Sequence, residues 1–145
     1  MRAMGLILLA AVAAVAAARP AQVSAQGKPV PDFGFYRSRV EPIFLTKKEG
    51  HTRCVVCHEG ASNNFHLERL GPGANAWTEE QSRRNFAMVQ NLINPGDPET
   101  SLLTLHPLAP EAGGHAFHSG GRQFESRSDK DWETLVAFVI GAKGQ

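Results

Sequence analysis

The chain has 145 residues, 42% of them hydrophobic, which is room for one domain with a modest core. Its 15 basic and 14 acidic side chains give a formal net charge of +1. Without the N-terminal leader, which contains Arg2 and Arg19, the balance becomes 13 basic against 14 acidic side chains. Such a near-neutral balance argues against nucleic acid as a partner.

Residues 1–25 are predicted to be a secretory signal peptide. Arg2 gives a positive start, residues 4–18 are an unbroken small and apolar run, and Val23-Ser24-Ala25 offers a cleavage site before Gln26. The apolar run is shorter than the roughly 20 residues that span a bilayer, so we expect cleavage rather than an uncleaved membrane anchor. The sequence therefore predicts a periplasmic or otherwise exported protein.

Residues 26–32 are interpreted as a short linker, and residues 33–145 as one domain. The domain opens with a predicted helix over residues 33–46, whose apolar positions are Phe35, Val40, Ile43 and Phe44. Pro42 lies inside this segment and is expected to break the helix or delay its start. Residues 47–53 are polar and are predicted to form a turn.

Cys54-Val55-Val56-Cys57-His58 contains the only two cysteines of the chain. A redox dithiol would need a βαβ context, and a zinc site would need two further ligands at short spacing. A structural disulfide is the plain alternative in an exported protein. His58 directly after Cys57 favours a different reading, because Cys-x-x-Cys-His is the attachment sequence of c-type haem. Cys54 and Cys57 are then the thioether positions and His58 the proximal iron ligand.

Residues 59–77 are rich in Gly, Asn and Pro and are predicted to form a loop, from which Phe65, Leu67 and Leu70 could pack on a haem edge. Thr78 to Gln81 matches a capping box. The helix that it opens is predicted to run to about Leu92 and to end before residues 94–98.

Ser101–Leu105 is predicted as a short apolar turn or helix, and residues 106–127 as a long loop. Ser128 to Asp131 is interpreted as a second capping box, which opens a last helix that Gly141 ends. No run alternates as a strand does, so the predicted fold class is all-α.

This order of elements resembles the cytochrome c fold. Residues 94–103, the segment His118-Ser119-Gly120-Gly121-Arg122 and the closing helix with Trp132 are similar to planctomycete-type cytochrome c domains. The resemblance implies a helical domain wrapped around one covalently attached haem. It also implies that the first and last helices cross, with Phe35 and Phe44 packed against Trp132, Leu135 and Phe138.

The sequence leaves the sixth iron ligand open. His118 is favoured, because it lies in the loop before the last helix and matches the His-before-glycines of the family. His115 and Met88 are the alternatives, although Met88 lies within a predicted helix. Other histidines and arginines are interpreted as solvated side chains: His51, His66, His106, Arg83, Arg84 and Arg122.

These features predict a monohaem c-type cytochrome that carries single electrons outside the cytoplasmic membrane. We expect haem c and its iron as cofactor, redox proteins as partners, no small-molecule substrate and no enzymatic activity. The protein would act as a soluble carrier or as a small redox subunit of a larger complex, with membrane association of that complex possible. The alternative is a haem enzyme or gas-binding sensor with an open sixth position.

Overall fold

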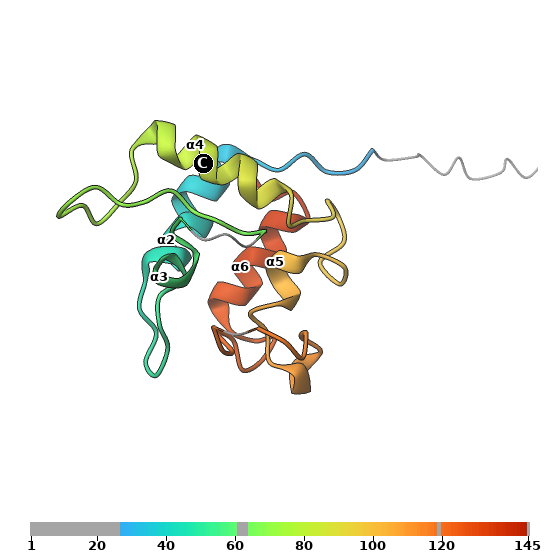
Figure 1. The fold of residues 1–145 in the computed structure, drawn as a ribbon. Coiled ribbons are helices and arrows are strands. Elements are labelled where there is room, and N and C mark those ends of the chain that lie inside the picture. Colours follow the sequence, from blue (N-terminus) through green and yellow to red (C-terminus); the bar gives the residue numbers. More distant parts are fainter. Residues whose placement is uncertain (1–26, 61–63, 119, 145) are drawn as a thin grey trace, which may run out of the picture.

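The computed structural model describes residues 27–60, 64–118 and 120–144, and within them it is helical (Figure 1). No strand forms in these ranges, which hold only isolated bridge pairs such as Glu59 with Leu67. The prediction of the all-α class is confirmed. The predicted signal peptide, its cleavage site and Ser119 lie outside the described residues.

The first helical segment runs without a break from Phe33 to Leu45, but its middle is wider than an α-helix. It consists of α1 (Phe33–Phe35), the π-helical η1 (Tyr36–Val40) and α2 (Glu41–Leu45). Asp32 caps it by accepting a 2.7 Å hydrogen bond from the Phe35 backbone. Pro42 explains the wide turn, since proline offers no N–H to the carbonyl four residues earlier and its ring would clash there. Pro42 therefore widens the predicted helix instead of breaking it.

Two helices follow at the motif and after the long loop. α3 (Cys54–His58) is a single turn that the sequence did not predict as helix. α4 (Glu79–Gln90) begins with the predicted capping box. In that box the Gln81 backbone donates to the Thr78 hydroxyl at 3.3 Å, and the Thr78 backbone donates to the Gln81 side chain at 3.0 Å.

The last part of the chain contains α5 (Leu102–Leu105), the 3₁₀ turn η2 (Pro110–Ala112) and α6 (Lys130–Val139). The predicted cap of α6 is wrong by one residue. Asp129 accepts from the backbones of Asp131 and Trp132, while the Ser128 hydroxyl bonds to Ser126 instead. A carboxylate at the N-terminus also suits the helix dipole.

Gly141 ends α6 as predicted, with φ +90°. The Gly141 and Ala142 backbones donate to the carbonyls of Phe138 and Ala137, which is the Schellman arrangement.

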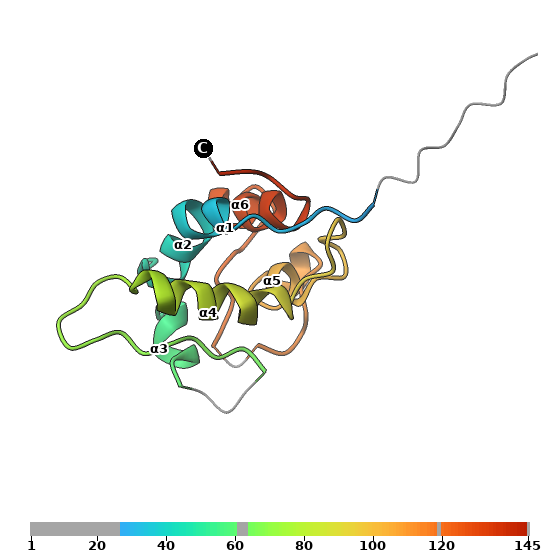
Figure 2. The same ribbon diagram turned by 90° about the horizontal axis from the view of Figure 1, so that it is seen from above.

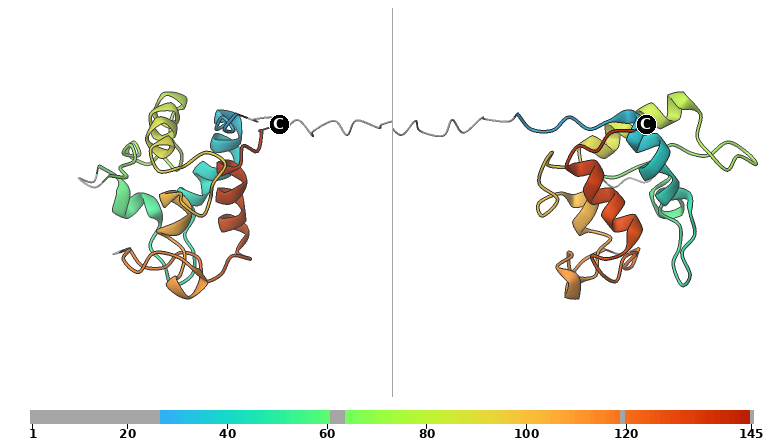
Figure 3. Two further views of the ribbon diagram at one scale, coloured as in Figure 1. Left: turned by 90° about the vertical axis from the view of Figure 1, so that its right-hand side faces the viewer. Right: turned by 180° about the vertical axis from the view of Figure 1, so that it is seen from behind.

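The first and last helical segments lie side by side, as Figures 2 and 3 show. The contact is made by Tyr36, which is fully buried, with its ring centroid 6.1 Å from that of Phe138. Phe35 is only partly buried at the edge of the core. The two segments are thus in contact, but Tyr36 takes the place that the sequence assigned to Phe35.

Residues 27–32 form no helix and lie against the C-terminal end of the domain. The Gly144 backbone donates to Asp32 at 2.9 Å, and the Lys143 ammonium donates to the Val30 carbonyl at 3.0 Å. Pro29 contacts the turns at Gly96 and Gly141. The segment interpreted as a linker therefore makes specific contacts with the domain.

Candidate functional site

The helices and the loop after α5 enclose a cavity of about 450 Å³. This volume lies within the roughly 300–1,000 Å³ of small-molecule and cofactor sites. α2, α3, α5, α6 and residues 106–124 contribute its walls, and most of the side chains are apolar. The lining residues include Phe44, Cys54, Cys57, His58, Phe65, Leu102, His106, Phe117, His118 and Leu135.

α3 places both cysteines on the cavity. Cys54 and Cys57 are three residues apart, so one helical turn brings their side chains to the same face. Val55 points into the core and anchors the turn, with 2% of its surface exposed. Burial raises the pKa of the Cys54 thiol to about 11, so this thiol stays protonated at neutral pH. Cys57 is exposed, and neither cysteine is in a disulfide.

His58 lines the cavity, and a hydrogen bond from its ring to the backbone fixes the orientation of that ring. Its Nδ1 lies 2.8 Å from the Phe65 carbonyl oxygen. A carbonyl can only accept, so Nδ1 donates; in a neutral ring held this way, Nε2 is the atom that carries the lone pair. Two main-chain bonds tie the same segments together: Leu67 donates to the His58 carbonyl at 2.8 Å, and Gly60 donates to the Leu67 carbonyl at 3.1 Å.

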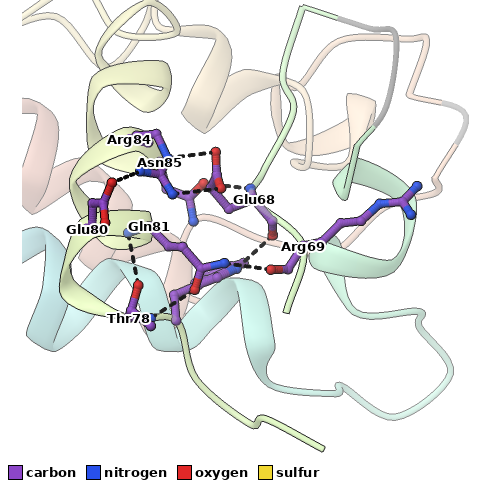
Figure 4. Close-up of polar contacts among 8 residues, drawn as sticks. Glu68, Arg69, Thr78, Glu80, Gln81, Arg84 and Asn85 are labelled. Atoms are coloured by element: carbon purple, nitrogen blue, oxygen red, sulfur yellow. Dashed lines mark hydrogen bonds and ion pairs between the residues drawn. The ribbon is translucent and has the colours of Figure 1, made fainter. Parts of the chain in front are cut away.

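α4 holds the segment that orients His58 (Figure 4). The Glu68 backbone donates to Asn85 at 2.8 Å, and its carbonyl accepts from the Trp77 indole at 2.7 Å. Gln81 donates to the Arg69 carbonyl at 2.8 Å. Arg84 bridges Glu68 and Glu80. The loop after the motif is therefore pinned to α4 through its own backbone.

Of the three loop side chains expected at a haem edge, only Phe65 lines the cavity. Leu67 is 1% exposed and lies in the core cluster, while Leu70 packs against that cluster from outside. The Phe65 carbonyl as the partner of His58 was missed by sequence reasoning, because a main-chain acceptor leaves no mark on residue type.

His118 faces the same cavity from the loop before α6. Its Nδ1 lies 2.7 Å from the Gly121 carbonyl oxygen, and the Gly121 backbone donates to the His118 carbonyl at 2.9 Å. Gly121 has φ +83°, a left-handed conformation that favours glycine. The His118 ring centroid is 6.1 Å from that of His58, with ring planes 12° from parallel. Both rings thus have Nδ1 against a carbonyl oxygen, and among the described residues neither Nε2 makes a hydrogen bond.

The alternatives named from sequence lie elsewhere. His115 is exposed, and Met88 is partly buried on α4; neither lines the cavity. Arg83, Arg84 and Arg122 are exposed and paired with carboxylates, and His66 is exposed. His51 is half-buried in a shallow depression beside residues 47–56.

The interpretation of His106 as a solvated side chain is wrong. His106 lines the cavity, and its Nδ1 is buried without a hydrogen-bond partner in the described part of the chain. Its ring contacts His115, with centroids 4.6 Å apart, and lies 6.2 Å from the ring of His118. Burial, and then the neighbouring histidines His115 and His118, lower its pKa. His106 is the C-cap of the short helix α5, and this helix directs it toward the cavity. The sequence after Leu105 was predicted as a loop and gave no indication of this orientation.

Comparison with family models, curated proteins and solved structures gives no match for this chain. In the ranges 27–60, 64–118 and 120–144, no helix has the length and apolar character needed to cross a membrane. The chemistry of the site must therefore be argued from its own residues.

Proposed function

We propose that this protein is a monohaem c-type cytochrome that carries single electrons outside the cytoplasmic membrane. In this proposal Cys54 and Cys57 hold haem c covalently, and His58 and His118 bind its iron on the two faces. The partner is another redox protein, and the chain is a soluble carrier or a small redox subunit.

The pair of anchored histidines is the observation that carries the proposal. An imidazole nitrogen binds a transition metal at about 2 Å, and the ring centre lies about 1 Å behind that nitrogen. Two imidazoles on opposite sides of one metal therefore have centroids roughly 6 Å apart. The rings of His58 and His118 are 6.1 Å apart. Metal-binding histidines also usually donate their other ring N–H to a carbonyl or carboxylate, as both of these do.

The lining of the cavity suits a largely apolar group that also carries polar atoms. Phe44, Phe65 and Leu135 give the cavity apolar walls, and both cysteines also line it. His106 adds a buried ring nitrogen, Nδ1, that has no hydrogen-bond partner among the described residues and that a polar group of the ligand would satisfy. Leu102 and Phe117 line the cavity yet are 38% and 89% exposed, so an apolar ligand would cover surface that is otherwise in water.

The residues divide the work of an electron carrier between them. When bound, haem supplies a one-electron couple at its iron. His58 and His118 would both bind the iron, which would favour electron transfer over binding of a gas or peroxide. The apolar walls would shield part of the bound group from water, and the cysteines would tether it to the protein. A haem enzyme or sensor with an open sixth position is the alternative, and it requires His118 to be displaced.

The decisive test is covalent haem in the exported protein. Haem should remain with the protein through acid–acetone extraction, and the pyridine haemochrome spectrum should be that of a haem joined by two thioethers. The double variant Cys54→Ala, Cys57→Ala should lose covalent haem, whereas His51→Ala, a nearby histidine outside the cavity, should keep it. Extractable haem, or none, in the unaltered protein contradicts the proposal.

A further inference from the structure

The side chain of Phe65 lies against the His58 ring, in addition to the hydrogen bond that its backbone accepts. The centroids of the two rings are 4.4 Å apart, and the ring planes are tilted by 40°. Aromatic pairs in proteins usually have centroids about 4.5–7 Å apart, so these two rings are in close contact. Phe65 therefore touches His58 through two separate parts, its carbonyl oxygen and its ring.

A hydrogen bond at one ring atom does not by itself fix the plane of a histidine. The torsion that turns an imidazole about its bond to Cβ is broad. The 2.8 Å hydrogen bond from Nδ1 of His58 to the Phe65 carbonyl tolerates some of this rotation. A second ring packed against the imidazole restricts it further, because rotation would drive the atoms of the two rings into each other.

Phe65 is itself supported by a row of aromatic rings that leads into the core. Its ring meets that of Phe44 in α2, with centroids 5.6 Å apart and planes at 65°. Phe44 is 3% exposed, and its centroid is 6.4 Å from that of Tyr36, which is fully buried. Dense interior packing leaves little room for such side chains to shift. The ring that contacts His58 is therefore held by the core.

The ring of His118, across the cavity, lies almost parallel to that of His58. The two planes differ by 12°. The contact of His118 with His106 is looser than that of His58 with Phe65, since the centroids are 6.2 Å apart. The angle between the two ring planes is thus determined by packing on the side of His58 and by the turn at Gly121 on the side of His118.

We propose that the Phe65 side chain is a positioning residue that sets the plane of the His58 ring and so keeps the two imidazole planes nearly parallel. The inference rests on the proposed function, in which both rings bind one iron. The angle between two axial imidazole planes decides how the d orbitals of low-spin ferric iron split. Parallel planes give a rhombic electron paramagnetic resonance signal, and perpendicular planes give a much more anisotropic one. Groups behind a metal ligand commonly tune the metal in this way.

Electron paramagnetic resonance of the frozen, oxidised, haem-loaded protein tests this proposal. The unaltered protein should give a rhombic low-spin signal. Phe65→Leu keeps the carbonyl acceptor and an apolar side chain but loses the ring, so the iron should stay low-spin while the low-field feature shifts to lower field. Phe65→Tyr keeps the ring and should keep the signal. A strongly anisotropic signal in the unaltered protein, no shift in Phe65→Leu, or an equal shift in Phe65→Tyr overturns the proposal.

Phe124→Leu is the matched control. Phe124 lines the same cavity and is 2% exposed, and in the described part of the chain its ring contacts neither His58 nor His118. Its loss should lower stability without shifting the signal. An equal shift in Phe124→Leu and Phe65→Leu would reflect a general loosening of the cavity and overturns the proposal. The covalent haem assay is separate: covalent haem with an unshifted Phe65→Leu signal overturns this inference alone, whereas absence of covalent haem overturns the proposed function as well.

Discussion

The two histidines that face each other across the cavity are held in different ways. His58 donates to the carbonyl of Phe65, seven residues further along, and that segment is held by Asn85 of α4 and by Trp77 in the loop just before α4. His118 donates to Gly121, three residues further along, and the Gly121 backbone donates back to it. The first anchor is tied into the fold, whereas the second is a self-contained turn.

This difference separates a fixed side of the site from an adjustable one. Moving the His58 ring requires changes in α3, the segment after it and α4 together. Moving the His118 ring requires a change in one turn that contains two glycines, Gly120 and Gly121. If the proposed function holds, changes on the His58 side should act mainly on stability, and changes on the His118 side should act mainly on the state of the iron.

The largest effect should come from His118→Ala. Losing one axial imidazole should convert most of the oxidised protein from low-spin to high-spin, and the reduced protein should bind carbon monoxide. Covalent haem should remain, because the cysteines are unchanged. Optical and electron paramagnetic resonance spectra measure the spin state.

Met88→Leu is the control for the other named ligand. This exchange nearly conserves volume, and Met88 does not line the cavity, so the spectra should be unchanged. If the His118→Ala protein stays low-spin and the Met88→Leu protein becomes high-spin, then Met88, and not His118, is the sixth ligand of the iron.

The turn that holds His118 can be tested without touching the ring. Gly121→Ala forces a Cβ into φ +83°, which costs roughly 1–2 kcal/mol and should be relieved by opening the turn. We expect a high-spin fraction in addition to the loss of stability. Gly73→Ala imposes similar strain at φ +72° in the loop before α4, where a Cβ would meet no atom within 4 Å. It should lower stability and leave the spin state unchanged; equal spectra for the two variants would show that the turn does not position His118.

Local signals in the sequence predicted the parts of the fold that local chemistry decides. Thr78 with Gln81, Gly141 and the all-α class follow from caps, a positive-φ position and the absence of alternation. The spacing of Cys54, Cys57 and His58 likewise placed three side chains on the cavity wall. Ser128 and Asp129 are adjacent and are both good capping residues, so the sequence alone could not decide between them. Of the two, only Asp129 also forms an ion pair with Lys48, and it is the residue that caps α6.

Features that depend on contacts between distant segments could not be predicted from local sequence signals. The π turn rotates the face of the first helix, so that Tyr36 replaces Phe35 in the core, and periodicity assumes a regular helix. His106 faces the cavity only because α5 packs on α6. The carbonyls of Phe65 and Gly121 belong to the backbone, and any residue type could provide them.

A change on the His58 side of the site should have a smaller effect, on stability alone. Trp77→Phe keeps an aromatic ring but removes the donor to the Glu68 carbonyl, which should cost roughly 0.5–1.5 kcal/mol. The spectra should stay low-spin, because the Glu68 backbone N–H still donates to Asn85 and keeps the same segment in place. Urea unfolding of the haem-loaded protein measures the loss. A high-spin signal in this variant would mean that the two histidine anchors do not differ as argued.

The smallest effect concerns Glu41, a buried carboxyl group of α2 that lies near Ser82 of α4. Burial raises the pKa of this carboxyl from its ordinary 4.5, while Ser82 and then Arg37 oppose the rise. The folded protein therefore holds the Glu41 proton to higher pH than the unfolded chain does. Above the ordinary pKa the unfolded chain releases this proton first, so Glu41 makes stability fall as pH rises, until the folded-state pKa is passed.

Glu41→Gln, which cannot ionise, should lack this decline. Its stability relative to the unaltered protein should rise with pH from about 4 upward and then level off. Carboxyls whose pKa is lowered, among them Asp32 and Asp129, act in the opposite direction, but they are present in both proteins and cancel in the difference. Melting temperatures of the two proteins across this range measure it. A difference that shrinks as pH rises would mean that Glu41 ionises more easily in the folded protein than in the unfolded chain, and that its surroundings are polar enough to hold a charge.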